Sequence, residues 1–242
     1  MTEYLYGHHS VIECMRAGRR KIHEIFLVDP DKNPEIVSLA RSQKIPLKHV
    51  EKHFIEKLVR DFKHQGIAAK VDSYSYVDFD DLDFEKTPSF IIACDSMTDP
   101  QNFGALCRSA YCFGVEAILL PKDRSVEVTP AVVATSAGAC EHLKISRVVN
   151  LVRSLESLKE KGYWIFAADQ KAKNKLEHLK TYDKVVVVAG SEGEGLRPLV
   201  SKCCDDSFSI PMKGNFDSLN VAQAMTIVCY ELSKKGPILS KN

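Results

Sequence analysis

Five short apolar runs in the second half of the chain constrain its fold more than any other feature. The runs are FIIACD, VEAILLP, YWIFAAD, VVVVAG and DSFSIPM, and most of them lack the alternation of apolar and polar residues. Strands that are apolar on both sides are typical of parallel sheets covered by helices on both faces. Helical stretches separate the runs, so the sequence predicts an α/β domain with a parallel sheet over residues 89–242.

Two of the separating stretches show clear helical periodicity. Residues 151–162 place Leu151, Leu155 and Leu158 on one face and end at Gly162, where a C-terminal cap belongs. The last helix has an apolar stripe at three- and four-residue steps, formed by Val221, Met225, Val228 and Leu232.

The first 77 residues follow a different pattern, in which short helical and strand-like stretches alternate. We expect a helix that closes at Gly18, a strand over 22–29, a helix over 35–43 and a strand over 45–50. A further helix follows, with an apolar face formed by Phe54, Ile55, Leu58, Val59 and Phe62. The alternating GIAAKV then predicts a last strand, and residues 1–77 together predict a small mixed α/β domain.

Residues 78–88, DFDDLDFEKTP, carry five acids against one lysine and end in Pro88. This is poor material for a core element, so we interpret the segment as an interdomain linker. No apolar run approaches the ~18 residues that span a bilayer, and the N-terminus lacks a long apolar stretch, so we expect a cytoplasmic protein. The 8 cysteines are scattered without a CxxC pair, which favours reduced core thiols.

The charges balance, because 33 Lys and Arg stand against 32 Asp and Glu, a net charge of +1. Overall charge therefore neither demands nor excludes a nucleic-acid partner. A local basic cluster lies in the first domain, formed by Arg16, Arg19, Arg20 and Lys21 near His8 and His9. Such a cluster suits nucleic-acid phosphates, but it is also typical of a solvated helix end.

Three segments combine residue types that can carry chemistry. The first follows the FIIACD strand and places Asn102 and Gly104 at a strand-to-helix turn, with Arg108 about one helical turn further on. The carboxyl ends of parallel strands are where open sheets bind ligands, although an Asn-capped helix with an exposed Arg is an equally good interpretation.

The second segment, VVVVAGSEGEGL, runs from a buried strand into Gly190, Gly193 and Gly195, with Glu192 and Glu194 between them. Bare backbone allows a ligand to approach closely, but the spacing matches neither a dinucleotide-binding nor a Walker loop. Two carboxylates disfavour a phosphate and suit a cationic or hydroxyl-rich ligand. A tight turn without a ligand explains the glycines equally well.

The third segment is SIPMKGNFDSLNVAQAM. A strand ends at Pro211, and a loop with Gly214 leads to Ser218, Leu219 and Asn220 at the start of the last helix. Ser218 or Asn220 is also able simply to cap that helix.

Taken in order, the patterns N-x-G-x-x-x-R-x-A, G-x-E-x-x-G-L and I-P-M-x-G-x-x-x-S-L-N-V resemble the three signature motifs of the SpoU/TrmH branch of the SPOUT RNA 2′-O-methyltransferases. Residues 129–151 and YWIFAAD are also similar to that family. GHHSVIECMRAG and HQGIAAKV are similar to the substrate-binding domain of the subgroup that methylates a guanosine of large-subunit ribosomal RNA. The resemblance runs from about Tyr6 to Leu232.

This resemblance implies a catalytic domain that threads a trefoil knot, binds S-adenosylmethionine in the loops of the knot and forms a homodimer. Gly190, Ile210 and Leu219 then offer backbone contacts to the adenosine part of the cofactor, and Ala167 and Ala168 line its pocket. The full set of cofactor-binding residues that the resemblance implies is Ala167, Ala168, Gly190, Gly195, Ile210, Met212 and Leu219.

The polar residues that the resemblance assigns to catalysis are Asn102, Arg108, Glu192, Ser218 and Asn220. The implied reaction moves a methyl group from a sulfonium to a ribose 2′-hydroxyl, which needs in-line placement and removal of a proton. A guanidinium with a pKa above about 12 is a poor base, so Arg108 either has a strongly perturbed pKa or binds a phosphate and stabilises the alkoxide, oriented by Asn102. The sequence leaves both roles open, and it does not say from which protomer the arginine comes.

Other functions stay open beside this one. Transfer RNA is an alternative substrate, and a non-catalytic RNA-binding relative in ribosome assembly is another reading, although all five polar motif residues are present. The resemblance favours RNA contact by the basic cluster of the first domain. A nucleotide-dependent oxidoreductase is disfavoured because no GxGxxG fingerprint follows an early strand. His49 and His53 lack a third ligand, so we expect no metal site.

Overall fold

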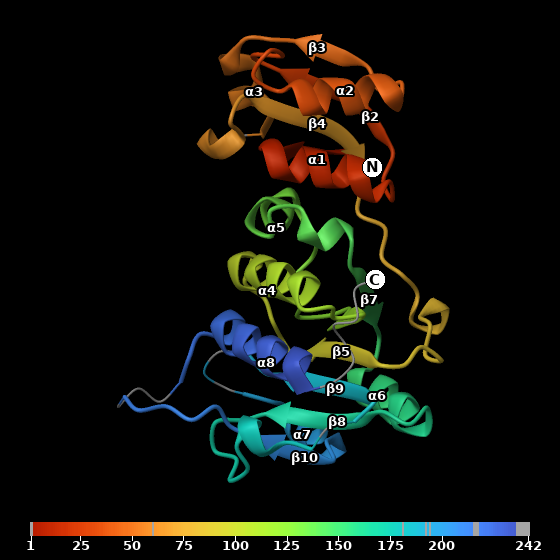
Figure 1. Ribbon diagram of the computed structural model, residues 1–242, viewed down its shortest axis with the longest axis vertical. Coiled ribbons are helices and arrows are strands. Elements are labelled where there is room, and N and C mark those ends of the chain that lie inside the picture. The colour runs from red at the N-terminus through yellow and green to blue at the C-terminus, as the bar shows by residue number, and fades with distance from the viewer. Residues whose placement is uncertain are drawn as a thin grey trace. The chain divides into compact units, whose positions relative to one another are not determined.

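The computed structural model describes residues 2–59, 61–180, 182–191, 193, 195–214 and 218–235. The chain divides into two compact units, whose elements are labelled in Figure 1. The first unit contains Met1–Ser75 and Glu127–His142, and the second contains Tyr76–Val126 and Leu143–Asn242.

The first unit is built on a mixed four-stranded sheet in the order β1-β4-β2-β3. β4 pairs antiparallel with both of its neighbours, while β3 pairs parallel with β2. The strands are β1 (Thr2–Tyr6), β2 (Ile22–Leu27), β3 (Leu47–His49) and β4 (Ile67–Asp72). The small mixed domain predicted from the sequence is therefore confirmed, with β1 as an additional strand.

The helices of this sheet are α1 (His8–Ala17), α2 (Pro34–Ser42) and α3 (Lys52–Val59). α1 ends as predicted, because Gly18 adopts the left-handed conformation, with φ 63°, that favours glycine. The apolar face predicted for α3 is wrong at Phe62, whose side chain is 89% exposed. Asp61 accepts a hydrogen bond from the backbone N–H of Lys63 at 2.7 Å and so starts a separate 3-10 turn, η1 (Phe62–His64).

A segment distant in sequence, residues 127–142, completes the first unit. It forms α5 (Pro130–Thr135) and the 3-10 turn η3 (Ala139–Glu141). A Cβ atom at Gly138 would lie 2.5 Å from Cβ of Glu13, so only glycine permits this approach to α1. The Tyr74 hydroxyl donates to the carbonyl of Cys140 at 3.2 Å. The interpretation of residues 78–88 as an interdomain linker remains a prediction. The sequence did not indicate that residues 127–142 pack with the N-terminal elements.

The second unit contains a six-stranded sheet in the order β10-β8-β9-β5-β6-β7, in which every pair is parallel. Five strands coincide with the five apolar runs, so the predicted parallel sheet is confirmed. The sixth, β7, carries Lys144 and Arg147 and lies at an edge of the sheet, which is why hydrophobicity did not reveal it. The strands are β5 (Ser89–Cys94), β6 (Ala117–Pro121), β7 (Lys144–Val148), β8 (Trp164–Ala168), β9 (Lys184–Ala189) and β10 (Asp206–Phe208).

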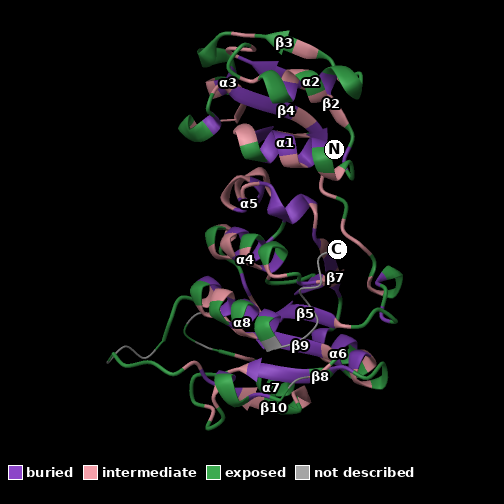
Figure 2. Ribbon diagram, in the orientation of Figure 1, coloured by how far each residue is buried: buried purple, intermediate pink, exposed green. Residues whose placement is uncertain are grey.

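Helices cover both faces of this sheet, which explains why its strands are apolar on both sides (Figure 1). α6 (Leu151–Glu160) and α7 (Pro198–Cys203) cover one face, where Ile91 of β5 packs in one core cluster with Leu155 of α6. α4 (Pro100–Cys112) and α8 (Val221–Lys235) cover the other. Figure 2 shows β5 as buried along its length, as are all six of its residues. No helix in the described ranges is long and apolar enough to cross a membrane.

The acidic segment 78–88 is itself part of the second unit. It contains the 3-10 turn η2 (Phe79–Asp81), and Leu82 and Phe84 join the core cluster under α6. The two apolar side chains anchor the segment while its carboxylates remain outside. A segment that looks like a linker by charge thus contributes to a core through two residues.

The cysteines are free thiols, as the sequence predicted, but Cys112 is exposed, so its assignment to the core is wrong. Burial raises the pKa of several of them, for example those of Cys94 and Cys229 to about 12. These two therefore stay protonated at neutral pH and behave as small apolar side chains.

Candidate active site

All three sequence motifs lie at the same edge of the second unit's sheet. The first motif follows β5, the Gly-rich segment follows β9, and the third motif follows β10. The strands β10, β8, β9 and β5 are consecutive neighbours and all run parallel, so their carboxyl ends meet at one edge. This is the edge at which open α/β sheets bind ligands. The fold thus brings together segments that are more than 100 residues apart.

The Gly-rich segment after β9 closes into a tight hairpin. Ser191 and Gly195 exchange two backbone hydrogen bonds, both 3.1 Å long. A Cβ atom at Gly190 would lie 2.4 Å from the carbonyl carbon of Gly195, so no other residue fits there. Gly195 has φ 73°, in the region that favours glycine. Glu192, predicted to be catalytic, lies outside the described residues.

An ion pair with a buried carboxylate anchors this hairpin. Asp95 directly follows β5 and is 0% exposed, and it accepts a hydrogen bond from the backbone N–H of Arg197 at 2.8 Å and from its Nε at 2.6 Å. Sequence analysis missed both residues. The signal was an acid at the end of an apolar strand and an arginine two positions beyond Gly195.

Two of the predicted catalytic residues are in direct contact. Asn220 donates a hydrogen bond from Nδ2 to Oδ1 of Asn102 at 2.8 Å. Asn220 also caps α8, because its Oδ1 accepts from the backbone N–H groups of Ala222 and Gln223. α4 is capped by Asp99, which accepts from the N–H of Asn102 at 3.0 Å. The capping interpretation of Asn220 is therefore confirmed, and the same amide contacts Asn102, while its catalytic role stays a prediction.

Packing of α4 against α8 keeps this asparagine pair in place. The hydroxyl groups of Ser109 and Thr226 share a hydrogen bond of 2.6 Å between the two helices. Further along, the rings of Phe113 and Tyr230 meet edge to face, 5.8 Å apart. The asparagine contact thus rests on a rigid helix pair.

Arg108 lies on α4 with its side chain exposed, and it makes no hydrogen bond or ion pair with any residue that the structure describes. The expectation that Asn102 orients Arg108 is not met within the described chain. Positions six apart on a helix differ by about 240° around the axis, so the two side chains leave α4 in different directions. The guanidinium is left open to solvent and to a ligand.

The remaining predicted cofactor-binding residues line the same edge. Ala167, which is buried, and the half-buried Ala168 end β8 with small side chains. Ile210 is half-buried just beyond β10. Met212, Ser218 and Leu219 are exposed on the loop before α8.

The basic cluster predicted in the first unit is not a uniform patch. Arg20 is buried, with its side chain and that of Glu141 each 1% exposed, and it donates to both Glu141 oxygens at 2.6 and 3.0 Å. Burial raises the pKa of Glu141, although the Arg20 guanidinium opposes that shift. An RNA phosphate cannot reach Arg20 without breaking this pair, so its assignment to RNA is withdrawn.

Other residues of the cluster are accessible. Arg19 and Lys21 are exposed, whereas Arg16 is half-exposed and forms ion pairs with Glu13 and Glu35. His8 and His9 lie at the start of α1 with their rings in edge contact, 5.4 Å apart. Within the described part of the chain, no group of three or more His, Cys, Asp or Glu side chains is arranged to hold a metal ion.

Two family models match the chain, each over one part of it. The SpoU rRNA Methylase family matches residues 89–230, and RNA 2′-O ribose methyltransferase substrate binding matches residues 4–77. The first match contains all three loops at the carboxyl edge.

Curated relatives match over nearly the full length. YacO of Bacillus subtilis, which carries the name TrmH family tRNA/rRNA methyltransferase, is 32% identical over 240 residues, covering 96% of both chains. A Staphylococcus saprophyticus protein with the same family name is 35% identical over 238 residues, covering 96% of this chain and 95% of its own.

Solved structures share the fold. The AdoMet-bound rRNA methyltransferase of Sinorhizobium meliloti superimposes with a TM-score of 0.82 at 20% identity, over 96% of this chain and 87% of that chain. At this identity the likeness establishes a common architecture for the two proteins.

Proposed function

The chain belongs to the SpoU rRNA methylase family, and from this premise we propose that it methylates a ribose 2′-hydroxyl of RNA with S-adenosylmethionine as the methyl donor. The observation that carries this proposal is the Asn102–Asn220 contact, which joins the first and third motifs at the edge where the Gly-rich hairpin also lies. The substrate-binding model over residues 4–77, described as that of an RNA 2′-O ribose methyltransferase, supports the choice of hydroxyl.

The residues at the carboxyl edge fit S-adenosylmethionine. The closed Gly190–Gly195 hairpin presents bare backbone at Gly193 and Gly195, and the small side chains of Ala167 and Ala168 end the neighbouring strand β8. Ile210, Met212 and Leu219 add apolar surface for an adenine ring. When bound, S-adenosylmethionine supplies an activated methyl group on a sulfonium. The chain's part is to hold the ribose in line with that methyl group and to assist loss of the hydroxyl proton.

Arg108 is the residue to which we assign the charge that develops on the ribose oxygen. Its exposed guanidinium has no partner among the described residues, so it is available to an RNA oxygen or phosphate. Stabilisation of a developing alkoxide by a fixed cation lowers the barrier without requiring the guanidinium to give up a proton. Asn102 and Asn220 hold the adjoining helix ends, and Ser218 and Glu192 complete the proposed polar set.

We further propose a homodimer whose polypeptide threads the knot implied by the family motifs. α4 and α8 expose the large side chains of Tyr111, Ile227 and Tyr230, which suit burial against a second copy. In such a dimer, Arg108 of one protomer is free to act in the site of the other. Sedimentation of the purified protein measures the mass directly.

For the substrate we propose a guanosine of large-subunit ribosomal RNA, which would place the enzyme in the cytoplasm. Transfer RNA is the second candidate, because the curated relatives carry names that include both RNAs. Both proposals assign RNA binding to the first unit, through His8, His9, Arg16, Arg19 and Lys21. A non-catalytic assembly role is less well supported, since all five polar motif residues are present.

A direct experiment tests the proposal. Calorimetry with S-adenosylmethionine in the presence of a chelator should give binding, and incubation with transcribed ribosomal RNA should give 2′-O-methylated nucleosides after digestion. Binding that needs an added divalent ion would contradict the cofactor assignment. Methylation on a base, or of transfer RNA alone, would contradict the reaction or the substrate respectively.

A further inference from the structure

The ion pair between Asp95 and Arg197 leaves part of an arginine unused. Both Asp95 oxygens accept from Arg197, one from the backbone N–H and one from Nε. The Arg197 side chain is nevertheless 53% exposed, and its two Nη atoms make no hydrogen bond with any described residue. One edge of the guanidinium is therefore fixed against the protein while the other faces outward.

Stability alone does not explain this arrangement. Burying a carboxylate carries a desolvation penalty that one ion pair often fails to repay, so apolar residues at such positions are frequently as stable. The bond at Nε has a second effect, because the guanidinium is planar and its remaining N–H groups then point in a set direction. Asp95 thus fixes the direction in which the two Nη groups of Arg197 point.

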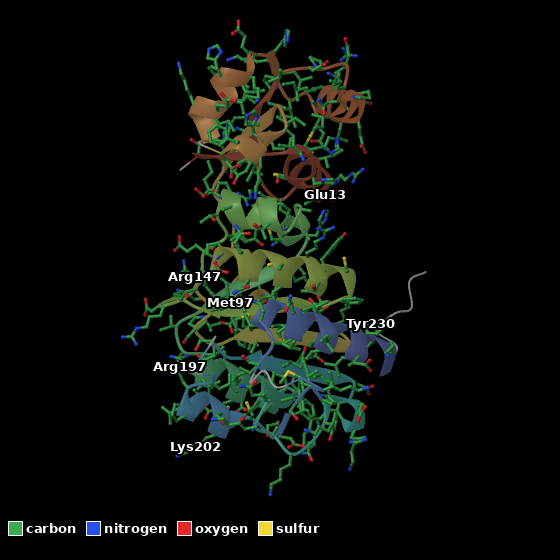
Figure 3. The ribbon with its side chains drawn as sticks, turned by 90° about the vertical axis from the view of Figure 1, so that its left-hand side faces the viewer. Glu13, Met97, Arg147, Arg197, Lys202 and Tyr230 are labelled. Carbon is green, nitrogen blue, oxygen red and sulfur yellow. The ribbon has the colours of Figure 1, made fainter. Side chains whose placement is uncertain are left out.

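Other cations lie at the same carboxyl edge of the sheet as Arg197. Arg197 follows β9, Lys122 and Arg124 are exposed on the segment after β6, and Arg147 lies near the end of β7. β9 and β6 are separated by β5 alone, which corresponds to about 10 Å at the usual strand spacing. In Figure 3, Arg147, Met97 and Arg197 follow one another along the same side of the second unit, in the order of their strands β7, β5 and β9. The carboxyl edge therefore carries several cations, with the exposed Asp123 as an acid between Lys122 and Arg124.

We propose that Arg197 binds a phosphate of the RNA strand that is being methylated, and that Asp95 is the positioning residue that directs its guanidinium. This inference rests on the proposed function. Two parallel N–H groups match two phosphate oxygens, a geometry that a lysine cannot reproduce. Lys122 and Arg124 extend the contact to neighbouring phosphates, so the RNA backbone runs along the edge past the Gly-rich hairpin.

The test compares three variants with the wild type. Arg197→Gln removes the charge, Asp95→Asn keeps the Arg197 charge but removes its buried partner, and Lys202→Gln is the matched control on the exposed face of α7. The readouts are the affinity for transcribed large-subunit ribosomal RNA as a function of salt, the Kd for S-adenosylmethionine, and kcat and KM for the RNA. Thermal melting checks that each variant is folded.

We expect Arg197→Gln to weaken RNA binding about tenfold near 0.1 M salt and to reduce the log–log salt slope by about one unit. The Kd for S-adenosylmethionine should stay within about twofold of the wild type. Asp95→Asn should raise KM for RNA with little change in kcat, and adding it to Arg197→Gln should have no further effect on RNA binding, since both act through one contact. Lys202→Gln should match the wild type.

Two results would overturn the inference. The first is an Arg197→Gln salt slope equal to that of Lys202→Gln, which would make the arginine purely structural. The second is a weakened Kd for S-adenosylmethionine with an unchanged RNA slope, which would assign Arg197 to the cofactor's carboxylate. Failure of the proposed function is distinguishable, because the wild type would then transfer no methyl group to the RNA, whatever the variants do to RNA affinity.

Discussion

The two units of this protein use their charged side chains in opposite ways. In the first unit, Arg20 is enclosed with Glu141, and Arg16 is held by Glu13 and Glu35. In the second, Arg108 has no partner in the described chain, and Arg197 keeps one edge of its guanidinium open. The basic residues that look most like an RNA patch in the sequence are thus partly structural, while Arg108 on α4 and Arg197 after β9 keep guanidinium N–H groups open to a ligand.

The contrast follows from what surrounds each cation. A guanidinium between packed elements must have a carboxylate, because an unpaired buried charge is strongly unfavourable. A guanidinium on the exposed face of a helix, like that of Arg108, needs no carboxylate partner and stays free for a ligand. Clustering of cations in sequence therefore says less about function than the position of a single cation relative to a strand end.

The largest expected effect concerns the open guanidinium of Arg108 in the second unit. Arg108→Ala should reduce the rate of methyl transfer about 1000-fold, because it removes a group that stabilises charge in the transition state. Melting temperature and S-adenosylmethionine affinity should be unchanged, since the side chain is exposed and without a described partner. Arg108→Lys should also fail, because an ammonium lacks the planar fork. Near-normal turnover by either variant would remove Arg108 from the mechanism.

Glu141→Gln tests whether the buried Arg20–Glu141 pair stabilises the first unit. This near-isosteric change removes the two-point carboxylate partner of Arg20 and leaves only Glu3, whose Oε2 lies 3.2 Å from Nη1, so we expect the free energy of unfolding to fall by about 3 kcal/mol. Lys48→Gln, which removes the partner of Glu24 in an exposed ion pair, is the control and should cost about 1 kcal/mol or less. Equal, small losses in denaturant titrations would show that the buried pair is not a structural link.

Two variants of Asn220 separate its capping of α8 from its contact with Asn102. Asn220→Asp keeps an oxygen for the start of α8 but replaces the donor that faces Asn102, so activity should fall about tenfold or more with little change in stability. Asn220→Ala should lose the activity and also about 1 kcal/mol of stability, because the cap is gone. If the Asp variant is fully active, the contact with Asn102 has no part in the reaction.

The exposed part of the basic cluster should have a moderate effect on RNA binding. The double variant Arg19→Gln, Lys21→Gln is expected to reduce the salt slope by up to about two units, since each lost phosphate contact removes about one. Lys48→Gln again serves as the control for a lost surface charge in the same unit. Superimposable salt titrations for all three proteins would identify the cluster as a solvated helix end.

The smallest expected effect is a pH dependence in the first unit. Burial opposes ionisation of Glu13, but hydrogen bonds from His142 and Arg16 outweigh it and hold the pKa of Glu13 below its ordinary value of 4.5. The carboxylate therefore stabilises the fold above that pH, and its contribution disappears as the pH falls through the lower folded-state pKa. The melting temperatures of wild type and Glu13→Gln should differ by about 2 °C near neutrality and converge in acid. A constant difference would contradict this.

Much of the fold was predictable from local pattern. The apolar runs located five strands of the second unit, since burial on both faces leaves a continuous signal, and Gly18 ended α1 as expected. β7 escaped because an edge strand tolerates Lys144 and Arg147. Phe62 was misplaced because the Asp61 turn overrides the helical spacing.

The motifs placed Asn102 and Asn220 near the starts of α4 and α8, where the structure brings them into contact, while their catalytic role stays a prediction. Arg20 was misassigned because its partner, Glu141, lies 121 residues away in a segment with no sequence sign of belonging to the first unit. Asp95 and Arg197 were missed for the same reason, because the two residues are 102 positions apart in the sequence. Local sequence gives the type of a charge, and only the tertiary structure gives its partner.

The most direct test of the account is a map of 2′-O-methylation across ribosomal and transfer RNA from cells that lack the protein, cells that carry the wild type and cells that carry Arg108→Ala. The account predicts a ribose methyl group on a large-subunit ribosomal RNA guanosine that is absent without the protein, restored by the wild type and not restored by Arg108→Ala. An unchanged methylation map in the cells that lack the protein, or full restoration by Arg108→Ala, would contradict it.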